Sequence, residues 1–158
     1  LEVINQKKLL ETCRKEPSAV NLFKAIMAIK NKLKYPRIQL HMFGLYITIQ
    51  NKNFPIKPLA NRNGMVLAAT AAASKAYVGK LSETSDILEA YGQPVSDIGL
   101  SELEKLSNYL KQPDLLSKGI ACHKDFDVIT VPTILIEKPK TLVGMGDTIS
   151  AFSIVGAR

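Results

Sequence analysis

Two glycines and an aspartate near the end of the chain stand at a spacing suited to phosphate chemistry. The segment TLVGMGDTIS, residues 141–150, places Gly144 and Gly146 around Met145 and follows them at once with Asp147. Glycines in a short loop let backbone N–H groups approach a ligand, and a helix that begins just after them points its free N–H groups and positive dipole end toward the same place. The segment is therefore suited to binding an anion, and Asp147 is either a base beside that anion or a helix N-cap.

The composition bounds the kind of protein that would carry such a site. Of 158 residues, 46% are hydrophobic and 22% are charged, which is typical of one globular domain with an apolar core. Cys13 and Cys122 lack paired spacing and no signal-peptide pattern accompanies them, so we expect a reducing, cytoplasmic setting rather than a disulfide scaffold. No apolar run approaches the ~18 residues of a membrane span, so no membrane partner is expected.

The formal net charge of +7 could indicate a nucleic acid, an anionic lipid or a phosphorylated substrate as partner. The lysines are spread over several segments, and no cluster of arginines and aromatic residues appears. A solvated basic surface is therefore the favoured interpretation, and no nucleic-acid partner is expected. A nucleic-acid binder stays an alternative, and it predicts an affinity that falls steeply with salt.

The periodicity of apolar residues predicts helices that alternate with strands. Helices are expected at residues 1–16, 17–35, 64–78, 85–91 and 101–112, and from the glycine segment to about residue 155. Ser101, with a glutamate three residues later, is the expected N-cap of the fifth of these helices. Strands are expected at 37–50, split by Gly44, and at 126–141, with a turn at Pro132; residues 51–63 are expected to form a loop. Strands between helices imply an α/β layer structure.

Three blocks of the sequence together resemble one enzyme family. They are RIQLHMFGLY at 37–46, VLAATAAASKA at 66–76 and VPTILIEKPKTLVGMGDTIS at 131–150. In this order and spacing they resemble the C-terminal third of the archaeal-type ADP-dependent sugar kinases, which comprise phosphofructokinases and glucokinases. The resemblance implies a ribokinase-like, three-layer α/β/α fold. It also implies that residues 1–158 form only the C-terminal part of the large nucleotide-binding domain, with the lid domain and the upstream sheet outside this chain.

The resemblance assigns roles to the glycine segment. Asp147 matches the catalytic base, which takes the proton from the sugar hydroxyl as its oxygen attacks the terminal phosphate of ADP. The amides of Gly144, Met145 and Gly146 match the anion hole that stabilises the transferring phosphoryl group. If Asp147 were only an N-cap, its role would be structural.

Four further residues are assigned to the nucleotide by the same resemblance. His41 and Tyr46 match residues near the nucleotide, where the Tyr46 ring could cover the adenine. Ile136 and Val143 match apolar positions that line the adenine site. Taken alone, these apolar and aromatic residues would be assigned to packing. Met42 stands where the family commonly has a threonine, so the wall of the pocket differs here.

The residues that would complete an active site are expected outside this chain. The family organises Mg²⁺ through an Asn-x-x-Glu motif, and no asparagine here has a glutamate three positions later. The Mg²⁺ ligands and the sugar contacts are therefore expected upstream, and the missing N-terminal part of the same protein is an expected partner, along with ADP or AMP and a sugar or sugar phosphate.

The acceptor is the least determined part of the prediction. The GDTISAF ending and the alanine-rich helix favour ADP-dependent phosphofructokinase, which converts fructose 6-phosphate to fructose 1,6-bisphosphate and releases AMP. ADP-dependent glucokinase is the first alternative, and a non-catalytic nucleotide-binding or interaction fragment is the second. The chain alone is expected to be inactive, because the metal and sugar halves of the site are missing from it.

Overall fold

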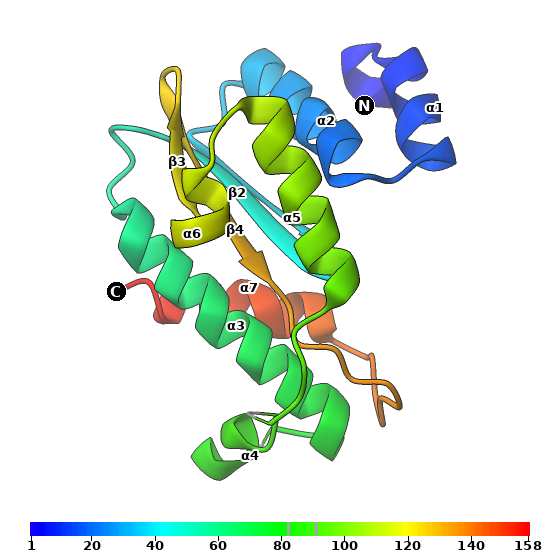
Figure 1. The fold of residues 1–158 in the computed structure, drawn as a ribbon, viewed down its shortest axis with the longest axis vertical. Coiled ribbons are helices and arrows are strands. Elements are labelled where there is room, and N and C mark those ends of the chain that lie inside the picture. Colours follow the sequence, from blue (N-terminus) through cyan, green and yellow to red (C-terminus); the bar gives the residue numbers. More distant parts are fainter. Residues whose placement is uncertain (82, 91) are drawn as a thin grey trace.

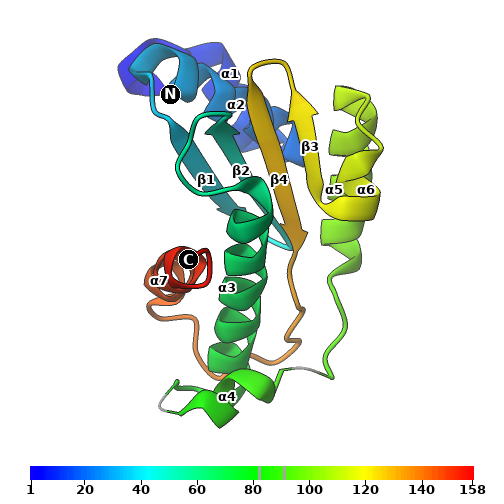
Figure 2. The same ribbon diagram turned by 90° about the vertical axis from the view of Figure 1, so that its left-hand side faces the viewer.

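The computed structural model describes residues 1–81, 83–90 and 92–158, which form three layers (Figure 1). A four-stranded antiparallel sheet lies in the middle, and helices cover both of its faces (Figure 2). The expected three-layer α/β arrangement is thereby confirmed. The helices are α1 (Lys7–Lys15), α2 (Ala19–Leu33), α3 (Pro58–Val78), α4 (Thr84–Leu88), α5 (Asp97–Leu110), α6 (Asp114–Lys118) and α7 (Met145–Val155). The strands, in the spatial order β1-β2-β4-β3, are β1 (Arg37–Met42), β2 (Leu45–Asn51), β3 (Ile120–His123) and β4 (Phe126–Pro132).

The β1–β2 hairpin turns at Gly44, as the sequence predicts. His41 of β1 pairs with Tyr46 of β2, and β2 pairs on its other side with β4. The first six residues of β2 are all buried, which fits its position inside the sheet. The side chains alternate between the two faces: Leu45, Ile47 and Ile49 face one core, while Tyr46, Thr48 and Gln50 face α3 on the other side.

Each face of the sheet has its own apolar core. On one face, side chains of α2, α5 and α6 pack against Leu45, Ile47 and Ile49. On the other face, α3 and α7 pack against Tyr46 and Ile129. The small side chains of α3 let it lie close to the sheet and to α7, because a buried alanine holds neighbouring backbones at short range. The prediction that the alanine-rich helix packs on the sheet is confirmed.

Helix α3 begins six residues earlier than predicted. Residues 58–63 were expected to lie in a loop because of their Pro and Asn content, but Pro58 occupies the first turn, where its missing N–H costs no hydrogen bond. Asn61 is fully buried, and its Nδ2 donates to Gln50 Oε1 at 2.7 Å. A tertiary hydrogen bond thus overrides the preference of asparagine for loops.

Other boundaries also differ from the sequence-based expectation. Helix α5 begins at Asp97 and is capped by Ser96, whose Oγ accepts from the N–H of Gly99 at 3.2 Å; the prediction of Ser101 as the cap was wrong. The first expected helix is broken at Asn5, which adopts a left-handed conformation between a short 3₁₀ turn and α1. Residues 133–141 make one bridge, Ile134 to Val95, instead of a second strand. The helix expected at 85–91 is α4, and residue 91 lies outside the described residues.

Glu102 joins two helices of the outer layer. Its Oε2 accepts from the backbone N–H of Ala19 at 2.6 Å, and its Oε1 accepts from Lys105 Nζ at 2.6 Å. Burial alone would raise the pKa of the Glu102 carboxyl, but these two hydrogen bonds outweigh it and lower the pKa below the ordinary value of 4.5. The carboxylate therefore holds the first turn of α2 against α5.

We expect Glu102→Ala to lower the free energy of unfolding by about 1–3 kcal/mol at pH 7, because the Ala19 N–H loses its buried acceptor. Since the folded-state pKa lies below the unfolded value, the stabilisation is present above about pH 4.5 and is lost as pH falls through the folded value. Urea denaturation of wild type and variant at pH 7 and pH 3 measures both effects. Glu104→Ala, an exposed change on the same helix, is the control, and equal losses from the two substitutions would contradict the assignment.

Candidate functional site

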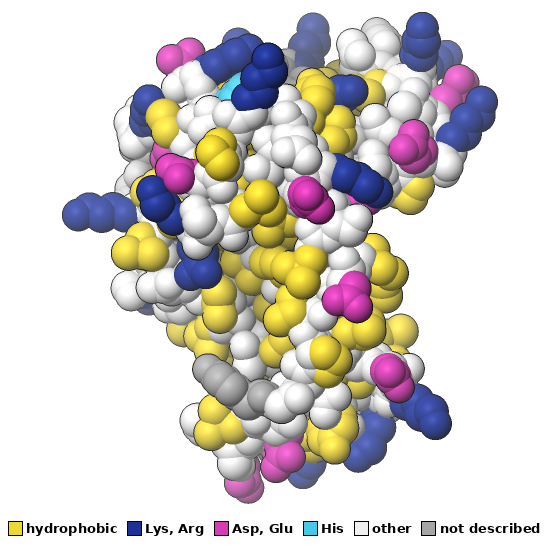
Figure 3. Space-filling model, in the orientation of Figure 1, with side chains coloured by type: hydrophobic (Ala, Val, Ile, Leu, Met, Phe, Trp, Pro, Cys, Tyr) yellow, Lys and Arg dark blue, Asp and Glu magenta, His cyan; other side chains and the backbone are white. Residues whose placement is uncertain are grey.

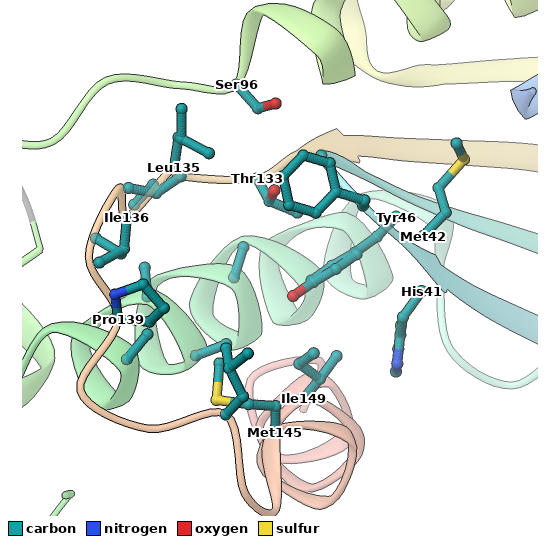
Figure 4. A pocket seen from close by; sticks show the side chains of 18 of the residues that line it. His41, Met42, Tyr46, Ser96, Thr133, Leu135, Ile136, Pro139, Met145 and Ile149 are labelled. Atoms are coloured by element: carbon teal, nitrogen blue, oxygen red, sulfur yellow. The ribbon is translucent and has the colours of Figure 1, made fainter. Parts of the chain in front are cut away.

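A largely apolar pocket of about 460 Å³ lies where the β1–β2 turn, α3, α7 and the segment 133–142 meet (Figure 4). The middle of the face in Figure 3 is mostly hydrophobic, and lysine and arginine side chains lie mainly around its periphery. Alanines of α3 form one wall of the pocket, and residues of α7 and of the segment after β4 form others. The lining includes His41, Tyr46, Ala69, Ala72, Ala73, Ala76, Ser96, Thr133, Leu135, Ile136, Leu142, Met145 and Ile149.

Helix α7 begins beside this pocket at the glycine segment. Gly144 precedes the helix with φ +66°, a left-handed conformation that L side chains rarely adopt, so a glycine is required there. No side chain caps α7. Its first-turn N–H groups and positive dipole end are therefore available to an anion. Met145, the first residue of α7, lines the pocket, which makes the pocket and this helix terminus neighbours.

Asp147 is the third residue of α7, and its side chain is exposed. It is not the N-cap, because Gly144 holds that position and the helix has no side-chain cap. An aspartate in the first turn still interacts favourably with the helix dipole, by about 0.3–1 kcal/mol. The simple N-cap interpretation of Asp147 is thus wrong, and its exposed carboxylate lies beside the glycine segment.

Lys75 is a residue of this region that the sequence analysis missed. From α3, its Nζ lies 3.4 Å from the carbonyl oxygen of Gly144 and 3.2 Å from Thr148 Oγ1. Thr148 Oγ1 also donates to the same carbonyl at 3.0 Å. These contacts hold the start of α7 against α3. Lys75 is the only charged residue in the alanine-rich run 64–79, and this isolation is a signal that could have found it.

His41 and Tyr46 form the end of the pocket next to the sheet. Their ring centroids are 4.9 Å apart at an interplanar angle of 51°. Tyr46 is only 5% exposed, and Figure 4 shows its side chain extending from the sheet toward the side where Met145 and Ile149 lie. Burial raises the pKa of the Tyr46 phenol, and burial together with the nearby Arg37 lowers the pKa of His41. Both rings are therefore uncharged at neutral pH.

The two apolar residues assigned to the adenine site lie differently. Ile136 lines the pocket. Val143 is 81% exposed and does not line it, and Leu142 lies there instead. The left-handed turn at Gly144 redirects the chain just before α7, so that Leu142 and Met145 face the pocket while Val143 faces solvent. The structure thus brings together His41, Tyr46, Ile136 and Met145, and it leaves Val143 outside.

Comparison with known proteins places the chain in a family. Residues 1–156 match the family model described as the ADP-specific phosphofructokinase/glucokinase conserved region. The chain belongs to this family. The resemblance seen in the three sequence blocks is therefore confirmed.

Members of both branches of the family are similar to this chain. The ADP-specific phosphofructokinase of Methanosarcina acetivorans is 30% identical over 145 residues, which cover 89% of this chain and 30% of the relative. The ADP-dependent glucose/glucosamine kinase of Pyrococcus furiosus is 29% identical over 158 residues, covering 99% of this chain and 33% of the relative. The chain thus spans about a third of the length of these relatives.

A solved structure supports the same grouping. An ADP-dependent kinase in complex with fructose-6-phosphate and ADPbetaS is 33% identical to this chain, with a TM-score of 0.91 and coverage of 99% of this chain and 36% of that one. The last common ancestor of ADP-dependent phosphofructokinases from Methanosarcinales is 35% identical, with a TM-score of 0.82 and coverage of 87% of this chain and 29% of that one. The family fold is therefore shared over nearly the whole of this chain.

Within residues 1–81, 83–90 and 92–158, no three His, Cys, Asp or Glu side chains lie together in a way that could hold a metal ion. None of the helices in this part of the chain has the length and apolar character needed to cross a membrane.

Proposed function

We propose that this chain supplies the nucleotide-binding part of an ADP-dependent 6-phosphofructokinase. The protein would transfer the β-phosphate of ADP to fructose 6-phosphate, forming fructose 1,6-bisphosphate and releasing AMP. The observation that carries the proposal is the position of Met145, which lines the apolar pocket and is also the first residue of α7. A ligand with a flat apolar ring and a charged phosphate tail fits this pair of neighbouring surfaces.

The pocket suits an adenine ring. Its volume of about 460 Å³ falls within the range of small-molecule sites, and its walls are mostly apolar. The uncharged Tyr46 ring can stack on the base, and Ile136 supplies a further apolar contact in the same pocket. With the base seated here, the diphosphate would extend toward the first turn of α7.

The glycine segment suits phosphoryl transfer. The sugar hydroxyl oxygen would bond to the β-phosphorus of ADP while the bond from that phosphorus to the bridging oxygen breaks, and AMP leaves with the bond's electrons. Amides at Gly144, Met145 and Gly146 would stabilise the charge on the transferring group, because they are fixed donors at a helix N-terminus. Asp147, exposed and outside the capping position, would take the hydroxyl proton.

The remaining components of the site belong to the rest of the protein in this proposal. When bound, Mg²⁺ would offset negative charge on the diphosphate, and we propose that the residues that hold it lie upstream of this chain. We also propose that the chain is the C-terminal part of a large nucleotide-binding domain, with the rest of the same protein as its partner. The free thiols of Cys13 and Cys122 support a reducing compartment such as the cytoplasm.

The acceptor is tested by AMP formation in the full-length protein with ADP and either fructose 6-phosphate or glucose. We expect fructose 6-phosphate to be preferred, on the GDTISAF ending and the alanine-rich α3. Preference for glucose would favour the glucokinase alternative, since relatives of that branch are about equally similar. AMP formation with neither sugar would favour the non-catalytic alternative.

Gly146→Val is expected to weaken ADP binding at least tenfold and to lower turnover, with little effect on the melting temperature. A Cβ at Gly146 would meet nothing within 4 Å, so the glycine is not required by packing inside this chain. A branched side chain there would instead occupy the approach of the phosphates to the amides. Calorimetric titration with ADP and thermal melting of both proteins measure the two effects, and unchanged ADP affinity would contradict the phosphate assignment.

A further inference from the structure

We propose that Gln39 is a positioning residue that fixes His41 as a neutral imidazole with its proton on Nδ1, at the wall of the pocket. The protonation state follows from hydrogen bonds alone. Its consequence for a bound nucleotide rests on the proposed function.

The direction of the hydrogen bonds is set by Arg37. A guanidinium can only donate, and Arg37 Nη2 contacts both the side-chain amide of Gln39 and Asn61 Oδ1, the latter at 3.1 Å. The Gln39 atom that faces Arg37 must therefore be its oxygen, Oε1. This contact removes the usual freedom to exchange the oxygen and nitrogen of a glutamine amide.

The second branch from Arg37 runs in the same direction. The backbone carbonyl of Ile56 can only accept, and Gln50 Nε2 donates to it at 3.0 Å. Gln50 Oε1 in turn accepts from Asn61 Nδ2 at 2.7 Å, which leaves Asn61 Oδ1 to accept from Arg37. The guanidinium of Arg37 can only donate and the carbonyl of Ile56 can only accept. Both ends of this chain of hydrogen bonds therefore require the same orientation of the Asn61 and Gln50 amides.

The orientation of Gln39 determines the state of His41. With Oε1 on Arg37, Gln39 Nε2 lies 2.7 Å from His41 Nε2. An amide nitrogen only donates, so the ring Nε2 must accept and cannot carry a proton. The neutral ring then has its hydrogen on Nδ1. A protonated imidazole would place two N–H donors against each other at this distance, which is unfavourable.

The surroundings of His41 agree with a neutral ring. On its own strand the charged neighbour is Arg37, and from β2 it faces the Tyr46 ring at 4.9 Å. From α7 a small cavity beside it is lined by Ser150, Ser153 and Ile154. No carboxylate is among these described neighbours, and burial and Arg37 both lower the pKa of His41. The His41 ring that contacts Tyr46 therefore stays uncharged at the wall of the pocket.

The test is the tautomer of His41, with His123 for comparison, in selectively ¹⁵N-histidine-labelled full-length protein, read from long-range ¹H–¹⁵N correlation spectra across pH. At pH 7 His41 should show a protonated Nδ1 and an unprotonated Nε2. Gln39→Glu replaces the donor with an acceptor, so the proton should move to Nε2 and the pKa of His41 should rise. Gln39→Met removes the donor without adding charge and should give mixed tautomers. His123, on β3, is the internal control and should keep its spectrum.

Gln6→Glu, an exposed change of the same kind before α1, should leave His41 unaltered. A protonated Nε2 in wild type, or an unchanged His41 spectrum in Gln39→Met, would overturn the proposal. If Gln39→Glu does not fold, the spectra of wild type and Gln39→Met still test the proposal. The spectra need no nucleotide. If acidification lowers ADP affinity in Gln39→Glu but not in wild type, the role of Gln39 extends to the bound nucleotide. If the tautomers are as expected but ADP does not bind, the proposed function is refuted and the role of Gln39 in setting the His41 tautomer stands.

Discussion

Asp147→Asn should lower the turnover of the full-length protein by roughly 10² to 10⁴ and change ADP affinity only modestly. The amide has the size of the carboxylate but cannot accept the hydroxyl proton. The stability of the fold should change little, because Asp147 is exposed and does not cap α7. The variant loses only the favourable interaction of the carboxylate with the helix dipole, which is worth about 0.3–1 kcal/mol. Steady-state kinetics with ADP titration separates the two quantities.

The matched control for this variant is Asp114→Asn. Asp114 is also in the first turn of a helix, α6, and forms an exposed ion pair with Lys118 at 3.2 Å, which contributes little to stability. It lies in the layer on the opposite face of the sheet from α7. Near-wild-type turnover in Asp147→Asn would remove the base from the mechanism.

Gly64→Ala should lower the free energy of unfolding by about 1–3 kcal/mol, because it overfills the crossing of α3 and α7. A Cβ at Gly64 would lie 2.3 Å from the backbone oxygen of Ser153 and 2.9 Å from the backbone nitrogen of Ala157. These are backbone atoms, so α7 itself must move. The melting temperature should fall with the free energy of unfolding, by an amount that depends on the size of the cooperative unit.

A shift of α7 should also affect catalysis and nucleotide binding, because α7 contains Met145 and Asp147. We expect turnover and ADP affinity of Gly64→Ala to fall together with the melting temperature. Gly146→Ala is the control for stability, because its Cβ would meet nothing within 4 Å and alanine favours a helix. A Gly64→Ala protein that melts at the wild-type temperature would show that the two helices are not packed as described.

Local sequence patterns were sufficient to predict the helices and strands that form the pocket. The turn at Gly44, the stop of α3 at Gly79 and the start of α7 after Gly144 each depend on a glycine whose conformation other residues rarely adopt, and such positions are visible in a sequence. The apolar alternation of residues 126–132 likewise predicts β4. These elements position the pocket, so its location follows from predictable parts.

Tertiary contacts account for the parts that could not be predicted. Asn61 lies inside α3, where its side chain donates a hydrogen bond to Gln50. Gln50 is 11 residues away in the sequence, so a rule based on neighbouring residues does not predict this contact. Ser96 and Ser101 are both residues that can cap a helix. The structure uses Ser96, which follows Val95, and Val95 forms the bridge to Ile134. The contacts of Lys75 with Gly144 and Thr148 join residues 69 and 73 positions apart, which no spacing rule predicts. Strand alternation places Gln39 and His41 on one face of β1, but it does not give the direction of their hydrogen bond.

The most direct test of the nucleotide pocket is calorimetric titration of ADP into full-length wild type, Ile136→Ser and Leu116→Ser. Both substitutions shorten a partly or well exposed apolar side chain, but only Ile136 lines the pocket, whereas Leu116 is on α6. Loss of one apolar wall should weaken ADP binding by about tenfold in Ile136→Ser and leave Leu116→Ser at the wild-type affinity. Equal ADP affinity in all three proteins would contradict the placement of the nucleotide in this pocket.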